Sequence, residues 1–254
     1  MTVDDCVITS KKNIAKGVFD IWVKCPQIAA QAKAGQFVDI KCDGFTLRRP
    51  ISICDIDKNK TAIRLVFEER GEGTHWLVGK NTGDSLDILG PLGNGFMLGD
   101  KGKTAVFVGG GIGVPPLLCA AKHFGTNAVA ILGFRSAGAV ILKEDFEIAG
   151  ASVTICTDDG TMGFHGLVTE PLKKLISEKD CSVVFACGPK PMLKAVSQMC
   201  EEKGIDCFVS MEERMACGVG ACLSCACKVK KDGTEKYLHV CKNGPVFNSK
   251  TIVW

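Results

Sequence analysis

The sequence has one tyrosine, little net charge and no long uninterrupted hydrophobic run. A single tyrosine among 254 residues argues against a protein that stacks nucleic-acid bases on aromatic side chains. A formal net charge of +3 likewise gives no electrostatic reason to bind nucleic acid or an anionic membrane. The most apolar stretch, residues 104–121, is interrupted by four glycines and two prolines, so it predicts a strand, a loop and a helix instead of a membrane span.

Cysteine, by contrast, is abundant, with 15 residues. A secreted protein held together by disulfides is one interpretation. Three observations favour reduced thiols: the number is odd, the chain is too long to depend on disulfides, and its first residues contain no apolar signal-peptide core. We therefore expect a cytoplasmic protein with free cysteines.

The first hundred residues have the composition of β structure. Residues 18–23, 36–41 and 61–67 are short runs with strand composition, and Gly, Asp and Asn separate them. One helix is expected over residues 74–80, with Thr74 as its N-cap. Short strands at this spacing predict a β-barrel or a sandwich.

From about residue 100 onward, strands and helices alternate. Strands are expected over residues 104–108, 128–132, 152–156, 182–186 and 206–209, and helices over residues 114–123, 167–177 and 191–203. This alternation predicts a parallel α/β sheet covered by helices on both faces. After residue 210 the chain becomes rich in Cys, Gly and small residues. We therefore expect three domains, formed by residues 1–99, 100–209 and 210–254.

Four cysteines have the spacing of a plant-type [2Fe–2S] site: Cys217, Cys222, Cys225 and Cys241. The first three form a C-x4-C-x2-C motif, and fifteen residues separate the third from the fourth. Two irons bridged by two sulfides need four thiolates, and a loop can wrap such a cluster only where its backbone comes close to the sulfur atoms. Gly218 and Gly220 permit that approach. We expect Cys241 to lie on a strand that returns after a hairpin turn at residues 231–233.

Other interpretations of these cysteines remain open from the spacing alone. A loop with two glycines is a poor place for cysteines that only fill a core. Structural zinc sites commonly present cysteine pairs on both sides, whereas the second side here offers only Cys241. Redox-active thiols are a third interpretation. Cys227 lies two residues after Cys225, and we interpret it as a non-ligand.

Four further motifs suggest phosphate or dinucleotide binding. Arg48-Arg49-Pro50-Ile51-Ser52 places an Arg and a Ser where both can bind one diphosphate. Residues 71–77 begin with Gly-x-Gly-Thr, a turn that opens a helix and presents backbone N–H groups. Residues 109–116 form a glycine loop between a strand and a helix, and Cys187-Gly188-Pro189 ends a later strand. Each motif alone also fits an ordinary turn or a solvated strand edge.

The order of these motifs resembles the ferredoxin–NADP reductase superfamily. The cysteine motif behind them, within residues 211–222, narrows the resemblance to the electron-transfer subunits of type B dihydroorotate dehydrogenase, and the resemblance covers essentially the whole chain. It implies an N-terminal antiparallel β-barrel that binds FAD, a central parallel α/β domain that binds NAD, and a small C-terminal [2Fe–2S] domain.

The resemblance also implies which residues bind the cofactors. For FAD these are Arg49, Pro50, Ile51, Ser52, Val66, Phe67, Glu68, Gly73 and Thr74. For NAD these are Gly110, Gly111, Gly113, Cys187, Gly188 and Pro189. In simpler relatives a tyrosine often stands at the position of Ile51 and stacks on the flavin ring, so other residues must hold the ring here. Arg135 and Ser136 would suit the 2′-phosphate of NADP whereas the family prefers NAD, and the sequence leaves that choice open.

The resemblance finally implies a function and a partner. In the family, a TIM-barrel subunit with FMN oxidises dihydroorotate, and electrons pass through a [2Fe–2S] cluster and FAD to NAD⁺ in pyrimidine (UMP) biosynthesis. We therefore expect a heterotetramer with two subunits of each kind, contacts to the partner at residues 217–226, and no catalytic acid or base in this chain. One alternative is a subunit of an NAD(P)H-dependent ferredoxin reductase or sulfide dehydrogenase. Another is a zinc-stabilised binding module whose glycine loops are only turns.

Overall fold

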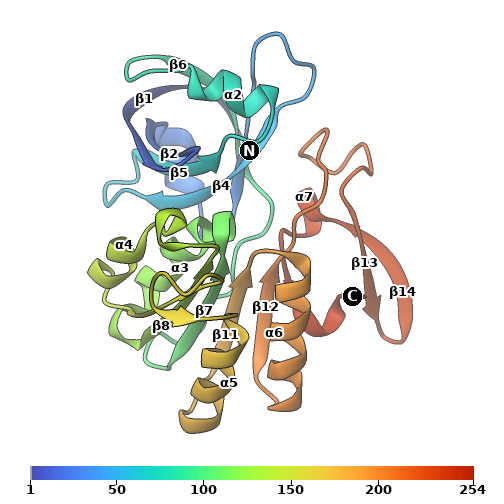
Figure 1. Cartoon of the computed structure of the whole chain (residues 1–254). Coiled ribbons are helices and arrows are strands. Elements are labelled where there is room, and N and C mark those ends of the chain that lie inside the picture. Colours follow the sequence, from blue (N-terminus) through green and yellow to red (C-terminus); the bar gives the residue numbers. More distant parts are fainter. Residues whose placement is uncertain (1) are drawn as a thin grey trace.

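The structure, a computed structural model, describes residues 2–254 and contains a β-barrel, an α/β sheet and a C-terminal tail (Figure 1). In this view the closed barrel lies above the seven-stranded sheet, and the tail lies along one side of both. Within the described range, no helix is both long enough and apolar enough to cross a membrane.

The barrel consists of six antiparallel strands in the order β1-β2-β5-β4-β3-β6. They are β1 (Thr2–Ala15), β2 (Val18–Lys24), β3 (Phe37–Ile40), β4 (Arg49–Ile56), β5 (Ala62–Glu68) and β6 (Ser85–Leu92). Strand β6 shows the alternation of a barrel strand: Leu86 and Ile88 are fully buried, whereas Asp87 between them and Leu89 after them are partly exposed. The predicted barrel is confirmed, with β1, β4 and β6 in addition to the three expected strands.

Two short helices, α1 (Pro26–Gln31) and α2 (Glu72–Val78), accompany the barrel. The helix expected at residues 74–80 begins two residues earlier, and the predicted N-cap at Thr74 is wrong. Gly71 holds the N-cap position. Thr74 lies inside the first turn, where its hydroxyl accepts the N–H groups of Arg70 and Gly71 at 2.9 and 3.1 Å. The hydroxyl therefore satisfies donors at the helix start from within the helix.

The sheet has the strand order β10-β9-β8-β7-β11-β12-β15, and all strands except β15 run parallel. The strands are β7 (Ala105–Gly110), β8 (Ala128–Phe134), β9 (Ser152–Thr157), β10 (Phe164–His165), β11 (Val183–Cys187), β12 (Asp206–Ser210) and β15 (Val246–Asn248). The helices are α3 (Pro115–Phe124), α4 (Lys143–Ile148), α5 (Thr169–Glu178) and α6 (Lys190–Glu202). Short 3-10 turns are η1 (Gly111–Gly113), η2 (Gly125–Asn127), η3 (Ala137–Ala139) and η4 (Ser249–Thr251).

Helices cover both faces of this sheet, as the alternating sequence predicts. Along β7, Val106 and Val108 belong to the core formed with α5 and α6. Ala105 and Phe107 belong to the core formed with α3 and α4. A central strand covered on both faces is buried along nearly its whole length, which explains why β7 reads as a continuous apolar run.

The tail is tied to both the barrel and the sheet. β13 (Ala226–Lys231) and β14 (Thr234–His239) form the predicted hairpin, and its turn residues Asp232 and Gly233 have φ angles of 53° and 78°. Positive φ angles at both positions are what a two-residue hairpin turn requires. The chain then forms α7 (Val240–Asn243), and β15 adds an antiparallel edge strand beside β12. The tail thus returns to complete the sheet.

Ion pairs also connect the barrel to the helices of the sheet. Arg64 on β5 is buried and donates to the two carboxylate oxygens of Asp20 on β2 at 3.0 and 2.8 Å. Its guanidinium also pairs with Asp145 on α4. Lys122 on α3 pairs with Asp55 on β4. These contacts fix the relative position of the two surfaces that enclose the candidate site.

Candidate functional site

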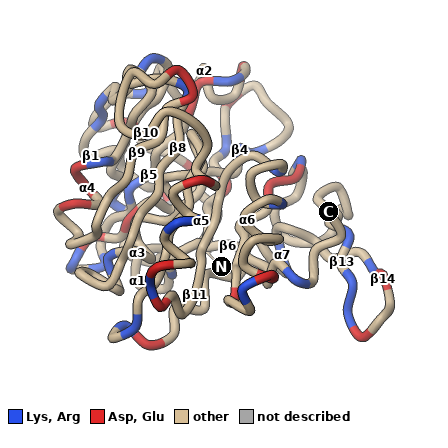
Figure 2. Tube along the Cα trace, turned by 60° about the horizontal axis from the view of Figure 1, so that its bottom comes forward, with Lys and Arg blue, Asp and Glu red and all other residues tan. Residues whose placement is uncertain are grey.

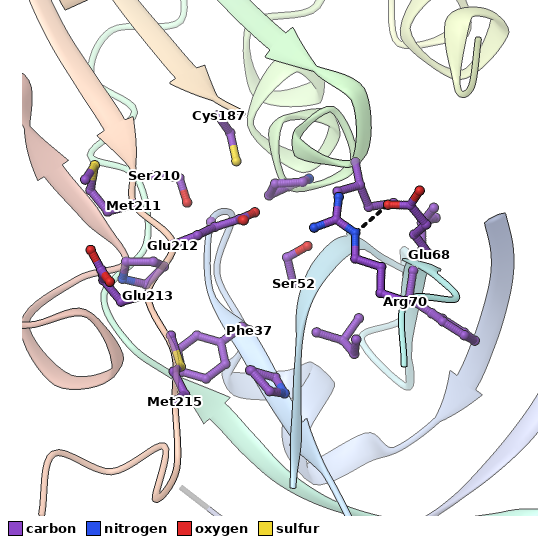
Figure 3. A pocket seen from close by; sticks show the side chains of 18 of the residues that line it. Phe37, Ser52, Glu68, Arg70, Cys187, Ser210, Met211, Glu212, Glu213 and Met215 are labelled. Atoms are coloured by element: carbon purple, nitrogen blue, oxygen red, sulfur yellow. Dashed lines mark hydrogen bonds and ion pairs between the residues drawn. The ribbon is translucent and has the colours of Figure 1, made fainter. Parts of the chain in front are cut away.

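A cavity of about 280 Å³ lies between the barrel and the sheet (Figure 3). The barrel side of its lining consists largely of residues that the sequence motifs or the family resemblance identify: Pro50, Ile51 and Ser52 on β4, Val66, Phe67 and Glu68 on β5, and Thr74 on α2. Three segments that are separated in sequence therefore meet at one wall. The wall combines apolar side chains with two hydroxyl groups and a carboxylate, which is typical of a cofactor site.

Arg49 and Gly73 are packed together beside this wall. A Cβ atom on Gly73 would lie 1.9 Å from Nε of Arg49, so only glycine lets the guanidinium lie against the first turn of α2. Nη1 of Arg49 donates to the carbonyl oxygen of Leu47 at 2.5 Å, and the Phe45 ring centroid lies 5.1 Å from Cζ. The structure thus holds a cation next to Pro50, at the edge of the cavity, where it suits a diphosphate.

The glycine loop and the Cys-Gly-Pro motif meet at the carboxyl ends of β7 and β11, which are adjacent parallel strands. A Cβ atom on Gly113 would lie 2.5 Å from the carbonyl oxygen of Cys187, and one on Gly110 would lie 2.9 Å from Cδ of Pro189. Gly188, with a φ angle of 154°, packs against Gly110 as well. The glycines therefore allow the two loops to pack closely at the edge where open α/β sheets bind nucleotides.

Three residues of these two motifs line the cavity: Ile112 and Pro116 of the glycine loop, and Cys187, which is the one among the residues expected to bind NAD. Burial and, to a smaller extent, the Glu212 carboxylate raise the pKa of the Cys187 thiol to about 12, against the opposing effect of a hydrogen bond with Ser210. The thiol is therefore protonated at neutral pH. Gly111 is left with open space around its α-carbon and a φ angle of 54°.

Sequence reasoning missed the third wall of the cavity, which follows β12. It consists of Ser210, Met211, Glu212, Glu213 and Met215. Gly35, Phe37, Arg70 and Pro245 complete the lining, and Arg70 pairs with Glu68 at 2.6 Å (Figure 3). The adjacency of β12 to β11 is the signal that identifies this wall, because the carboxyl ends of neighbouring parallel strands reach the same edge.

The four predicted ligand cysteines lie in one loop and in the helix after the hairpin, and hydrogen bonds link them as two pairs, Cys217 with Cys222 and Cys225 with Cys241. The N–H groups of Ala221 and Cys222 donate to Sγ of Cys217 at 3.2 and 3.4 Å. The N–H group of Cys241 donates to Sγ of Cys225 at 3.4 Å, and these two sulfur atoms lie 3.2 Å apart. Backbone donors that point at sulfur stabilise thiolates and tune iron–sulfur clusters. The donor set therefore fits a [2Fe–2S] cluster.

The loop backbone needs left-handed conformations to fold around these sulfur atoms. Gly218, Gly220 and Leu223 have φ angles of 67°, 85° and 64°. Cys241 lies in α7, so its predicted position on the returning strand is wrong. The reason is that β14 ends at His239. The helical turn that follows brings the Cys241 thiol next to the thiol of Cys225 in the loop.

Two other features of the cysteines bear on the ligand assignment. The sulfur of Cys227 contacts the carbonyl oxygen of Lys228 at 4.0 Å, whereas that of Cys225 contacts Cys241. All 15 cysteines are free thiols. Across residues 2–254, no three His, Cys, Asp or Glu side chains converge around the position of a single metal ion.

Cys222 is the exposed member of the ligand set. Hydrogen bonds from Ser224 and from backbone N–H groups lower the pKa of its thiol to about 6. The loop is also continuous with the cavity, because Met215 lines the cavity two residues before Cys217. The cavity and the cysteine loop thus form one connected site.

Comparison with known proteins agrees with this arrangement. Residues 212–253 match the family model for the iron-sulfur cluster binding domain of dihydroorotate dehydrogenase B. Two curated relatives are named dihydroorotate dehydrogenase B (NAD(+)), electron transfer subunit. The one from Geobacillus thermodenitrificans is 41% identical, and the one from Bacillus caldolyticus is 39% identical; each match covers 97% of this chain and 96% of the relative.

Two solved structures with a similar fold are those of reductases. A chain of the NADH-dependent reduced ferredoxin–NADP oxidoreductase, described in connection with flavin-based electron bifurcation, has a TM-score of 0.88 and 30% identity. That match covers 99% of this chain and 90% of the other. The ferredoxin reductase of carbazole 1,9a-dioxygenase has a TM-score of 0.69 at 18% identity, over 80% of this chain and 66% of its own, and shows a shared fold.

Proposed function

Because this chain belongs to the family of dihydroorotate dehydrogenase B electron transfer subunits, we propose that it passes electrons between an FMN-containing dihydroorotate dehydrogenase subunit and NAD⁺ in pyrimidine biosynthesis. The observation that carries this proposal is the connection of the cavity to the cysteine loop through Met215. The test is dihydroorotate-dependent reduction of NAD⁺ by the reconstituted complex.

We assign each cofactor to a part of the chain. The cluster ligands are Cys217, Cys222, Cys225 and Cys241. FAD binds at Arg49 to Ser52, Val66 to Glu68, Gly73 and Thr74, and NAD binds at Gly110, Gly111, Gly113 and Cys187 to Pro189. Bound FAD exchanges two electrons with a nicotinamide and single electrons with an iron–sulfur cluster. Residues 1–99, 100–209 and 210–254 are the corresponding domains, with β15 of the last completing the sheet of the second.

Phe37 and Met215 are the residues that we propose for holding the flavin ring. They lie together on one side of the cavity (Figure 3). An aromatic ring and a polarizable thioether can both pack against the face of the conjugated flavin ring. The aliphatic side chain of Ile51 cannot stack on that ring. Their side chains also exclude water from the wall that leads to the cysteine loop.

Replacing Arg49 by Met is expected to weaken FAD binding. Loss of a charge-assisted hydrogen bond costs about 1.5–3 kcal/mol, which corresponds to roughly ten- to a hundredfold in affinity. The measurement is FAD titration of the flavin-depleted protein followed by fluorescence. The matched variant Arg48→Met should change FAD affinity little, because Arg48 pairs with Asp87 at 2.8 Å. Equal effects of the two substitutions would contradict the role of Arg49.

The partner that we propose is a TIM-barrel subunit with FMN, in a cytoplasmic heterotetramer of two subunits of each kind. The cysteine loop is suited to the interface because Cys222 is exposed and two apolar side chains beside it, Val219 and Leu223, are 38% and 61% exposed. Exposed apolar residues of this kind mark interaction surfaces. Figure 2 shows basic residues along β13, the strand that follows this loop.

Replacing Leu223 by Asp is expected to weaken the complex by roughly tenfold or more, because a charge would be buried at an apolar contact. Analytical ultracentrifugation of the coexpressed subunits measures this change. The control is Ile148→Asp, which changes an exposed residue far from Leu223 in the sequence. Binding should also protect residues 217–226 from hydrogen exchange. Unchanged exchange in this loop on complex formation would exclude it from the interface.

A second candidate function is that of a subunit in an NAD(P)H-dependent ferredoxin reductase. The observation that favours it is the structural likeness to the NADH-dependent ferredoxin–NADP oxidoreductase. Coexpression with a TIM-barrel subunit separates the two functions. Dihydroorotate-dependent NAD⁺ reduction supports the first, whereas reduction of ferredoxin without any response to dihydroorotate supports the second.

A further inference from the structure

A buried carboxyl group lies between the barrel and the cysteine loop. Asp39 on β3 is 1% exposed, and its Oδ1 atom has no hydrogen-bond partner among residues 2–254. Its Oδ2 atom faces the loop, since a Cβ atom on Gly218 would lie 2.5 Å from it. Gly218 directly follows Cys217 and is itself buried. The loop thus passes over the carboxylate at a position where only glycine fits.

The charge of this carboxylate is not neutralised by a direct ion pair within the described chain. Arg48 donates to the main-chain carbonyl of Asp39 at 3.2 Å and pairs with Asp87 on β6. The Arg49 guanidinium lies against Gly73 and donates to Leu47. Burial raises the pKa of Asp39 to about 6, and the two arginines oppose that shift. The group is therefore ionised at neutral and alkaline pH.

We propose that the Asp39 carboxylate tunes the reduction potential of the cluster that the loop holds. Reduction adds one electron to the cluster, and a fixed negative charge in a buried position next to the loop opposes that addition. The carboxylate neither gains nor loses a bond in this role, and Asp39 acts on the cluster by its charge, from the position next to Gly218. This inference rests on the proposed function, because it requires that the loop binds a cluster.

The test is a redox titration followed by EPR on the coexpressed complex at about pH 8. In Asp39→Asn the reduction potential should become more positive, with an equilibrium constant for one-electron reduction roughly tenfold higher, or about 59 mV. Asp87→Asn is the matched control on the neighbouring strand β6. It should shift the potential much less, because Asp87 is 31% exposed and its charge is paired with Arg48.

An unchanged potential in Asp39→Asn, with the cluster fully present, would overturn the inference and leave the proposed function intact. Equal shifts in the two variants would also overturn it, since they would show a general effect of barrel charge. If Asp39→Asn carries no cluster, Asp39→Ser provides the same measurement with a smaller neutral side chain. Loss of the cluster in both variants would contradict tuning, because Asp39 would then be a structural residue. An unmodified complex without any cluster would refute the proposed function itself.

Discussion

Replacing Cys225 by Ala is expected to abolish the [2Fe–2S] cluster while leaving FAD bound. Cys225 is buried and lies 3.2 Å from Cys241, sulfur to sulfur, so its loss removes one of four ligands from the interior of the site. Alanine offers no replacement donor, and a plant-type [2Fe–2S] cluster is held by four thiolates. We expect the EPR signal of the reduced protein to disappear and the iron content to fall at least tenfold. This loss exceeds the effect of changing a residue that only contacts a ligand.

Cys227→Ala is the matched control for this variant. It removes a buried cysteine two residues away, on β13, whose sulfur contacts a backbone carbonyl group instead of another ligand. Its EPR signal and iron content should equal those of the unmodified protein. FAD content, measured by extraction, should be the same in both variants. Loss of the cluster in Cys227→Ala together with retention in Cys225→Ala would contradict the ligand assignment.

Replacing Arg64 by Met is expected to lower the free energy of unfolding by about 3–5 kcal/mol. Asp20 is 6% exposed, and both of its carboxylate oxygens accept hydrogen bonds from Arg64. Without the guanidinium, a buried carboxylate is left unpaired, and the contact with Asp145 on α4 is lost as well. Urea denaturation monitored by circular dichroism measures the change in the FAD-bound protein.

Two further variants separate this effect from that of ordinary charge removal. Lys143→Met breaks an exposed pair with Glu147 on α4 and should cost less than about 1 kcal/mol. The double variant Arg64→Met with Asp20→Leu removes both charges of the buried pair and should recover much of the lost stability. A destabilisation by Arg64→Met no larger than that by Lys143→Met would show that the buried pair does not hold the barrel against the sheet.

The elements that sequence patterns predicted share strong local signals. The parallel strands β7, β8 and β11 are continuous apolar runs because they are buried on both faces, and such runs are visible in composition. Strand β1 was not predicted because two runs of consecutive polar residues, Asp4-Asp5 and Thr9 to Asn13, interrupt the apolar pattern that marks a strand. β15 has three residues, and its pairing with β12 depends on the path of the whole tail.

The site residues likewise divide into those with a local sequence signal and those whose place depends on contacts between distant parts of the chain. Cysteine spacing predicted the ligand set because the four thiols lie close together in sequence and the cluster dictates their order. The wall from Ser210 to Met215 has no motif of its own, and its place in the cavity follows from the adjacency of β12 and β11. Asp39 was likewise invisible, since its importance arises from contact with Gly218, far away along the chain.

The most direct test of the account is a dihydroorotate-dependent NAD⁺ reduction assay. The chain is coexpressed with a TIM-barrel subunit that contains FMN, and NADH formation is followed by its absorbance in anaerobic solution. The account predicts NADH formation by the complex, none by either subunit alone, and none by a complex that contains Cys225→Ala. A complex that holds FMN, FAD and the cluster, oxidises dihydroorotate with an artificial acceptor and still fails to reduce NAD⁺ would contradict it.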